Sequence, residues 1–153
     1  MKRRILTLIP VLLVMALIFF FSAQTQTESS QTSGHLEKVV IAVLERYFDG
    51  QIADQEALLN QVSHIVRKLA HFTEFAVLGF FLMLHLSDRK KGWLWSGVVG
   101  IIYAISDEIH QIFVDGRGPG IIDACIDSLG VLTGIGVMRV LLLLIAHRKN
   151  DKG

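Results

Sequence analysis

Long apolar runs alternate with polar segments along this chain and predict four transmembrane helices. The runs cover about residues 5–22, 65–86, 93–113 and 121–146. Each is close to the roughly 20 residues that a helix needs to cross the hydrocarbon core of a bilayer. The sequence contains no repeat and no linker, so we expect one all-α domain over residues 1–153, built as a four-span helix bundle.

The first apolar run has two interpretations. It follows the basic residues 2–4 and ends at Phe21-Ser22-Ala23, which loosely fits the cleavage site of a signal peptide. Its apolar stretch is longer than the roughly 7–15 residues of a signal peptide core. We therefore expect a retained first span.

A helical pattern of a different kind lies between the first two spans. Over residues 35–48, apolar side chains recur at helical spacing and charged ones take the opposite face; the apolar positions are Leu36, Val39, Val40, Val43, Leu44 and Tyr47. This segment is too polar to span a bilayer and predicts an amphipathic helix at the membrane surface. The next helix is expected to begin near Asp54, a suitable N-cap, and to continue without a break into the second span.

Small residues indicate where helices approach closely. Gly130, Gly134 and Gly136 are expected to form a packing face on the fourth span, and Gly79 is assigned to packing on the second.

The charges of the polar segments predict an orientation. Basic residues cluster at positions 2–4, in the 87–92 loop and in the tail after residue 146. The 23–63 segment instead carries six acidic residues against two basic ones. Because basic loops stay in the cytoplasm, both termini are predicted to be cytoplasmic, and the amphipathic helix extracytoplasmic.

Composition supports a membrane protein and excludes other classes. The chain is 52% hydrophobic and 19% charged, whereas soluble domains are nearer 45–50% and about 25%. A net charge of +1 without a basic, aromatic-rich patch gives no indication of a nucleic-acid partner. A single cysteine, Cys125, excludes an intrachain disulfide and a cysteine-based zinc site.

Ionisable residues interrupt three of the spans. They lie at the start of the second span (67–74), the end of the third (107–111) and the start of the fourth (123–127). Such groups cost at least a few kcal/mol in the bilayer interior, so they usually face other helices and find partners there. In the predicted orientation all three stretches lie at the outer leaflet, which predicts one outward-facing polar pocket.

The same stretches carry a resemblance to a known family. Arg-Lys-Leu-Ala-His-Phe-Thr-Glu at 67–74, Tyr-Ala-Ile-Ser-Asp-Glu-Ile-His-Gln at 103–111, Gly-Arg at 116–117 and Asp-Ala-Cys-Ile-Asp at 123–127 resemble, in this order, the VanZ-like family. Phe-Phe-Phe-Ser-Ala-Gln at 19–24 is similar to that family's opening element. Two positions depart from the pattern: Phe75 stands where a tyrosine is common, and Asp115 where a proline is frequent.

The resemblance implies a bacterial cell-membrane protein with four spans, acting at the cell envelope. Some members are linked to resistance to glycopeptide antibiotics such as teicoplanin, and the family supplies no established reaction. The matching positions that it implies as site residues are Arg67, Lys68, His71, Glu74, Asp107, Glu108, His110, Gln111, Arg117, Asp123 and Asp127.

These residue types suit acid–base chemistry on an anionic substrate. His71 or Glu74 would act as the base, and Asp107 and Asp123 as acids or metal ligands. Arg117 and Lys68 would hold an anionic lipid-linked wall precursor or lipid head group. Arg67, Glu108 and Gln111 complete the expected substrate-binding set.

A divalent metal is the candidate cofactor. With histidines neutral, the acids among these positions outnumber the bases by two, an excess that a low-dielectric site compensates by protonation or by a cation. The spacings His-x-x-Glu and Asp-x-x-His place an imidazole and a carboxylate on one helix face, as in di-metal bundles. The candidate ligands for zinc, manganese or magnesium are His71, Glu74, Asp107, His110, Asp123 and Asp127.

Other functions remain open at this stage. A non-catalytic protein that binds or masks an envelope molecule fits the same residues, as does a purely structural polar network. A proton or ion pathway is disfavoured because the inner half of the spans offers only Arg139. The sequence contains no phosphate-binding loop, serine nucleophile motif or cysteine–histidine pair.

Overall fold

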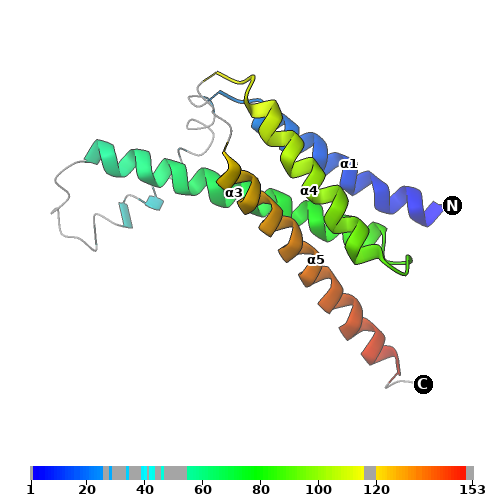
Figure 1. Ribbon diagram of the computed structural model, residues 1–153. Coiled ribbons are helices and arrows are strands. Elements are labelled where there is room, and N and C mark those ends of the chain that lie inside the picture. The colour runs from blue at the N-terminus through cyan, green and yellow to red at the C-terminus, as the bar shows by residue number, and fades with distance from the viewer. Residues whose placement is uncertain are drawn as a thin grey trace.

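All secondary structure in the described part of the chain is helical. The computed structural model describes residues 2–25, 28, 34, 39, 40, 42, 43, 46, 55–115 and 120–150. Its long helices are α1 (Lys2–Ser22), α3 (Gln55–His85), α4 (Gly92–Gln111) and α5 (Ile121–Asn150) (Figure 1). The predicted all-α class is confirmed, and α3 begins next to Asp54 and continues without interruption to His85, as predicted.

Two sequence-based predictions fall outside these residues. Most of the 35–48 segment, for which an amphipathic helix is predicted, is not described, and neither is Arg117.

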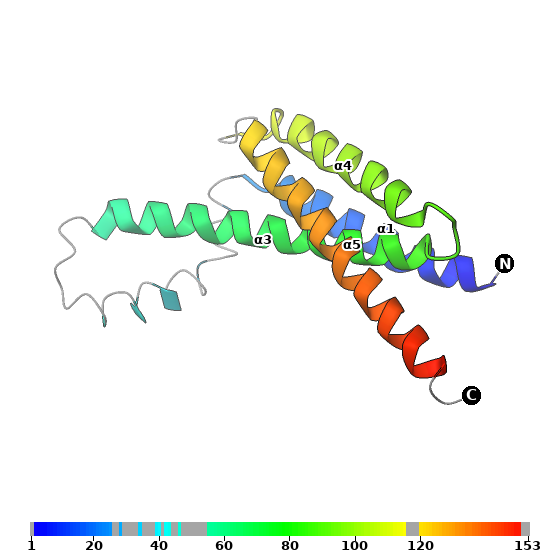
Figure 2. The ribbon, with the colours of Figure 1, turned by 60° about the horizontal axis from the view of Figure 1, so that its bottom comes forward.

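The helices pack around α3. Helix α5 crosses α3 and makes the most extensive contact in the bundle, while α1 also lies against α3 (Figures 1 and 2). Helix α4 packs on α5 and α3. The buried core contains Ile18 of α1, Phe75 and Leu78 of α3 and Val131 of α5, each with an exposed fraction of 0%. The first half of α3 projects beyond the other helices in both views.

Glycines allow the backbones of α3 and α5 to touch. A Cβ atom at Gly79 would collide with the carbonyl group of Val131, and one at Gly134 with that of Ala76. Gly130 in the same way lies against the carbonyl of Phe72. Close packing through these three glycines is therefore confirmed, and it fixes how deeply the two helices interlock.

The prediction for Gly136 is wrong. Apart from the nearby backbone of α5 itself, no atom of the described residues lies within 4 Å of a Cβ built at this position. Gly130 and Gly134 are four residues apart and share a helix face, whereas Gly136 lies two residues further along, on nearly the opposite face.

The described helices bury several polar side chains and expose many apolar ones. Polar residues are buried, among them Asp107, Glu108, Gln111 and Asp127. Large apolar side chains are exposed on all four helices; they include Leu12, Leu17, Phe20, Leu69, Ile102, Ile105, Ile109, Leu129, Leu132, Val140 and Leu143. An exposed apolar surface of this extent indicates a lipid environment or a protein partner.

Two of the described helices are long and apolar enough to cross a membrane, Arg4–Ser22 and Ile121–Asn150. Length and composition thus show two helices that could span a membrane, and the four-span arrangement remains a prediction.

Candidate functional site

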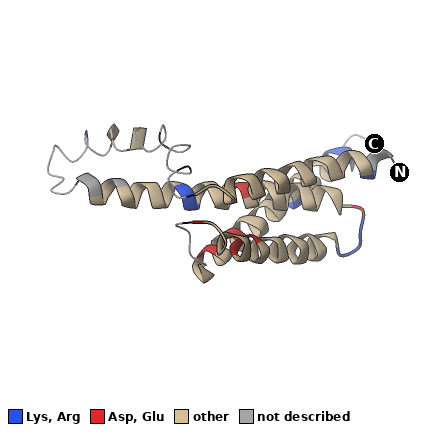
Figure 3. Cartoon of the chain, turned by 90° about the horizontal axis from the view of Figure 1, so that it is seen from above, with Lys and Arg blue, Asp and Glu red and all other residues tan. Residues whose placement is uncertain are grey.

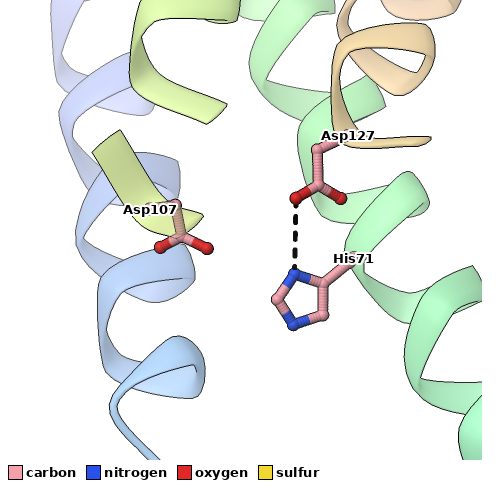
Figure 4. A group of neighbouring side chains, drawn as sticks. All are labelled: His71, Asp107 and Asp127. Atoms are coloured by element: carbon pink, nitrogen blue, oxygen red, sulfur yellow. Dashed lines mark ion pairs between the residues drawn. The ribbon is translucent and has the colours of Figure 1, made fainter. Parts of the chain in front are cut away.

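Three helices bring one ionisable side chain each to a common point. His71 of α3, Asp107 of α4 and Asp127 of α5 have nitrogen and oxygen atoms that all lie within 4.8 Å of one another. Figure 4 shows the Asp127 carboxylate above the His71 ring, joined to it by the dashed line, and the Asp107 carboxylate to one side. Asp107 and Asp127 are 3% and 1% exposed, and His71 is partly buried. We call these three residues the central cluster.

Asp127 has an unsatisfied oxygen in this cluster. Its Oδ2 atom lies 3.8 Å from His71 Nδ1, too far for a hydrogen bond. No described residue donates a hydrogen bond to Oδ2, although the atom is buried. A buried carboxylate oxygen without a donor is costly, and such an atom in a native site requires an explanation.

Asp107 is held by two neutral donors. Ser22 Oγ donates to Asp107 Oδ2 over 2.7 Å, and Gln111 Nε2 donates to the same oxygen over 2.9 Å. These bonds connect the end of α1 to the end of α4 and fix the carboxylate. Neutral donors stabilise the carboxylate without cancelling its charge.

Lys68 and Asp123 form an ion pair next to the cluster. Lys68 Nζ lies 2.7 Å from Asp123 Oδ1, in a geometry that satisfies charge pairing but not a directed hydrogen bond. Their side chains are 29% and 37% exposed. The pair lies about one turn from His71 on α3 and from Asp127 on α5. Lys68 therefore pairs with Asp123 rather than with a carboxylate of the central cluster.

A comparison with known protein families covers the motifs that meet at this site. The family model described as VanZ/LLP1 matches residues 7–143, most of the chain. The chain belongs to the VanZ/LLP1 family. No curated protein and no solved structure matches it. Membership and the two apolar helices together indicate a membrane protein of the cell envelope.

Glu108 of this VanZ/LLP1 protein contacts the backbone. Its Oε2 accepts a hydrogen bond of 2.9 Å from the N–H of Gly120, directly before α5. Glu108 is 7% exposed. This contact ties the end of α4 to the start of α5, so Glu108, expected among the substrate-binding residues, orients the elements that carry Asp107 and Asp123.

The remaining expected ligands lie outside the central cluster. Glu74 is partly buried one turn along α3 from His71. The ring of His110 stacks on Phe19 with 4.5 Å between ring centroids, and its buried Nε2 has no hydrogen-bond partner among the described residues. Of the six expected metal ligands, His71, Asp107 and Asp127 have ligand atoms within 4.8 Å of one another, and Glu74, His110 and Asp123 are not part of this group.

Of the basic residues expected in the site, Arg67 is partly buried one turn before His71, and no ion pair joins it to a described residue. Arg117 lies outside the described residues.

Ser22 is a site residue that the sequence analysis did not identify. It closes α1 with an exposed fraction of 0% and contacts Asp107 directly. The signal that would have found it is its place in the Phe-Phe-Phe-Ser-Ala-Gln element, which is part of the family resemblance.

The central cluster is suited to proton transfer or to cation binding. An imidazole beside a carboxylate is the arrangement of a histidine general base, and Asp127 would orient His71 in that role. Two buried carboxylates close together also attract a cation, because their charge is otherwise uncompensated in a low-dielectric site.

Proposed function

We propose that this protein is a four-span membrane protein whose central cluster, with the Lys68–Asp123 pair, forms an outward-facing site for an anionic molecule of the cell envelope. The molecule is a lipid-linked wall precursor or a lipid head group. Action on it, by reaction or by retention, raises tolerance to a glycopeptide such as teicoplanin.

Charge segregation along the bundle supports the orientation. In the view of Figure 3, Lys and Arg residues lie near both chain ends and in the α3–α4 loop, which also carries Asp88, while the acidic residues of α4 and α5 lie toward the other end, with the basic residues Arg67 and Lys68 of α3. The basic positions are Arg4, Arg89, Lys90, Lys91, Arg148 and Lys149. Because basic segments stay cytoplasmic, we place both termini inside and the central cluster at the outer leaflet.

One observation carries the proposal: three helices converge on a buried group of ionisable side chains that the contact between α3 and α5 does not need. Helix α3 already packs on α5 through Gly79, Gly130 and Gly134. An ionic network is a costly way to add to such a contact, because desolvating its charges offsets much of their attraction. A group that costs stability and adds little to docking is best explained by function.

The ion pair next to the cluster supports an anionic ligand. A pair that is about one-third exposed contributes only about 0–1 kcal/mol, so an incoming phosphate or carboxylate can replace Asp123 at Lys68 at little cost. The ligand would then lie next to His71, one turn away on α3.

The test is antibiotic susceptibility with matched variants. Wild type expressed in a teicoplanin-sensitive bacterium is expected to raise the minimal inhibitory concentration at least several-fold. His71→Ala and Asp127→Asn are expected to abolish the increase while accumulating in the membrane to the wild-type level. His147→Ala and Asp88→Asn, exposed substitutions at the opposite end, are expected to protect fully. Protection by the two cluster variants would contradict the proposal, and their failure to accumulate would indicate a structural network.

A second measurement separates reaction from retention. Lipid-linked wall precursors extracted from cells with wild type and with His71→Ala are compared by mass spectrometry. A reaction changes the mass of a precursor only with wild type. Retention leaves all masses unchanged, and the precursor copurifies with wild type but not with the variant.

A further inference from the structure

We propose that the central cluster is a divalent metal site with three protein ligands: His71, Asp107 and Asp127. This site has three of the six ligands that sequence spacing predicts, and each of the three comes from a different helix. The metal site deepens the proposed function. The role of the ion rests on that function, whereas the binding of the ion does not.

The separation of the side chains fits a shared ion. Zinc binds nitrogen and oxygen ligands at about 2.0–2.2 Å, which places neighbouring ligand atoms about 3–4 Å apart. The 3.8 Å between His71 Nδ1 and Asp127 Oδ2 falls in this range. This distance is too long for a hydrogen bond between the two atoms. The ligand atoms of all three residues lie within 4.8 Å of one another. A side-chain shift of about 1 Å would bring them to the separations that a shared ion requires.

The unsatisfied oxygen of Asp127 is an independent indication. Oδ2 is buried in a residue that is 1% exposed, it faces His71, and it accepts no hydrogen bond from the described residues. A metal ion satisfies such an atom without needing a donor hydrogen. It also explains why His71 and Asp127 face each other without forming a hydrogen bond.

Charge balance selects a divalent ion. Asp107 and Asp127 together carry two negative charges when ionised, and a neutral His71 adds none. Two basic residues of α3 lie within about one turn of His71: Lys68 is engaged by Asp123 at 2.7 Å, and Arg67 forms no ion pair with Asp107 or Asp127. One divalent ion brings the cluster to zero net charge, the least costly state for a group removed from water.

Asp107 is already positioned as a ligand. Both of its hydrogen bonds, from Ser22 and Gln111, go to Oδ2, so Oδ1 is the oxygen that they leave for an ion. Ligating carboxylates are characteristically fixed by hydrogen bonds of this kind, and loss of such a bond typically lowers metal affinity about 10–100-fold. Ser22 and Gln111 are accordingly positioning residues of the metal site.

The ligand set identifies the class of ion. One imidazole with two carboxylates favours a first-row transition ion such as Zn²⁺ or Mn²⁺, whereas Mg²⁺ and Ca²⁺ prefer all-oxygen sites. Three protein ligands leave at least one coordination position, as in catalytic rather than structural zinc sites. A phosphate or carboxylate oxygen of the envelope molecule would occupy it.

The experiment measures metal binding by the purified, full-length protein in detergent. Metal is removed with a chelator, and Zn²⁺, Mn²⁺ and Co²⁺ are added back while bound metal is measured by mass spectrometry and the absorption of Co²⁺ is recorded. We expect about one equivalent for wild type, loss of binding for His71→Ala and Asp127→Asn, and about 10–100-fold weaker binding for Ser22→Ala. His147→Ala and Asp88→Asn are the controls and are expected to bind as wild type.

Several outcomes would overturn the proposal. One is wild type that binds no more metal than Asp127→Asn, and another is loss of the ion in His110→Ala or Asp123→Asn, which would make the three-ligand set wrong. If the cluster variants do not fold, thermal unfolding of wild type decides: Zn²⁺ is expected to raise the midpoint and the chelator to reverse this, because a ligand of the native state stabilises it. An unchanged midpoint would contradict the metal site.

The two proposals fail separately. If the cluster variants lose metal but still protect cells from teicoplanin, the metal site stands and the proposed function falls. If wild type binds no metal and the same variants lose protection, the proposed function stands without the ion.

Discussion

At the scale of single residues, the site depends on how Asp107 is held. Its carboxylate is 3% exposed and receives hydrogen bonds from the end of α1 and from its own helix. Local spacing predicts the Gln111 contact, because residues four apart share a helix face. It cannot predict the Ser22 contact, which joins positions that are 85 residues apart in sequence.

Substitution of Ser22 by alanine is expected to destabilise the protein by about 1.5–3 kcal/mol, since the lost bond is buried and its acceptor is a carboxylate. Ser96→Ala is the matched control: Ser96 is equally buried, but its hydroxyl only donates to Gly92 O in the same helix. Unfolding in detergent measures both variants. Equal destabilisation of the two variants would show that the Ser22–Asp107 hydrogen bond contributes no more to stability than the Ser96 bond within α4.

At the scale of elements, the crossing of α3 and α5 sets the site. Phe72, whose carbonyl lies against Gly130, follows His71, and Asp127 precedes Gly130 by three residues. The depth of the glycine contact therefore determines the distance between His71 and Asp127. Helix spacing alone predicted pairs within one helix, such as His71 with Glu74, whereas the structure joins residues of three helices. The difference arises because contacts between helices depend on crossing angle and depth, which periodicity does not encode.

The glycines of α5 provide a test of this crossing. Gly134→Ala is expected to cost about 1–3 kcal/mol, because its Cβ meets the backbone of Ala76 and Phe80 and the helices must separate. Gly136→Ala is the control and is expected to stabilise by about 0.5–1 kcal/mol, since it adds helix propensity in open space. Denaturant unfolding in detergent measures the difference. Equal midpoints for the two variants would contradict the close contact.

At the scale of the whole molecule, the two ends of the bundle differ in chemistry. The central cluster lies where α1 and α4 end and α5 begins. Near the other end, Thr7 Oγ1 and His85 Nδ1 lie within 2.9 Å of each other, and Arg139 lies 5.7 Å from the centre of the Trp93 ring. Arg139, the charged residue noted in the inner half of the spans, thus has an aromatic partner at that end, which stabilises its charge by a cation–π interaction.

The helices could be predicted from the sequence, because apolar runs indicate helices. The sidedness that the charged segments indicate remains a prediction. The family also followed from motif order, and the match over residues 7–143 confirms it. What the sequence could not provide is the neighbourhood of each motif residue. Asp123 pairs with Lys68 and Glu108 with a backbone N–H, although their residue types suggested direct roles.

The orientation of the site underlies every functional proposal, and cysteine labelling of intact cells tests it most directly. Single cysteines are introduced in a Cys125→Ser background, one at Ser33 in the acidic 23–63 segment and one at Lys90 in the basic α3–α4 loop. Lys90 is exposed, whereas Gly92 in the same region is unsuitable because a side chain there meets the carbonyl of Leu86. With a membrane-impermeant maleimide, Ser33→Cys is expected to react in intact cells and Lys90→Cys only after permeabilisation. Labelling of Lys90→Cys in intact cells, with Ser33→Cys protected, would place the central cluster at the cytoplasmic face and contradict an outward-facing site.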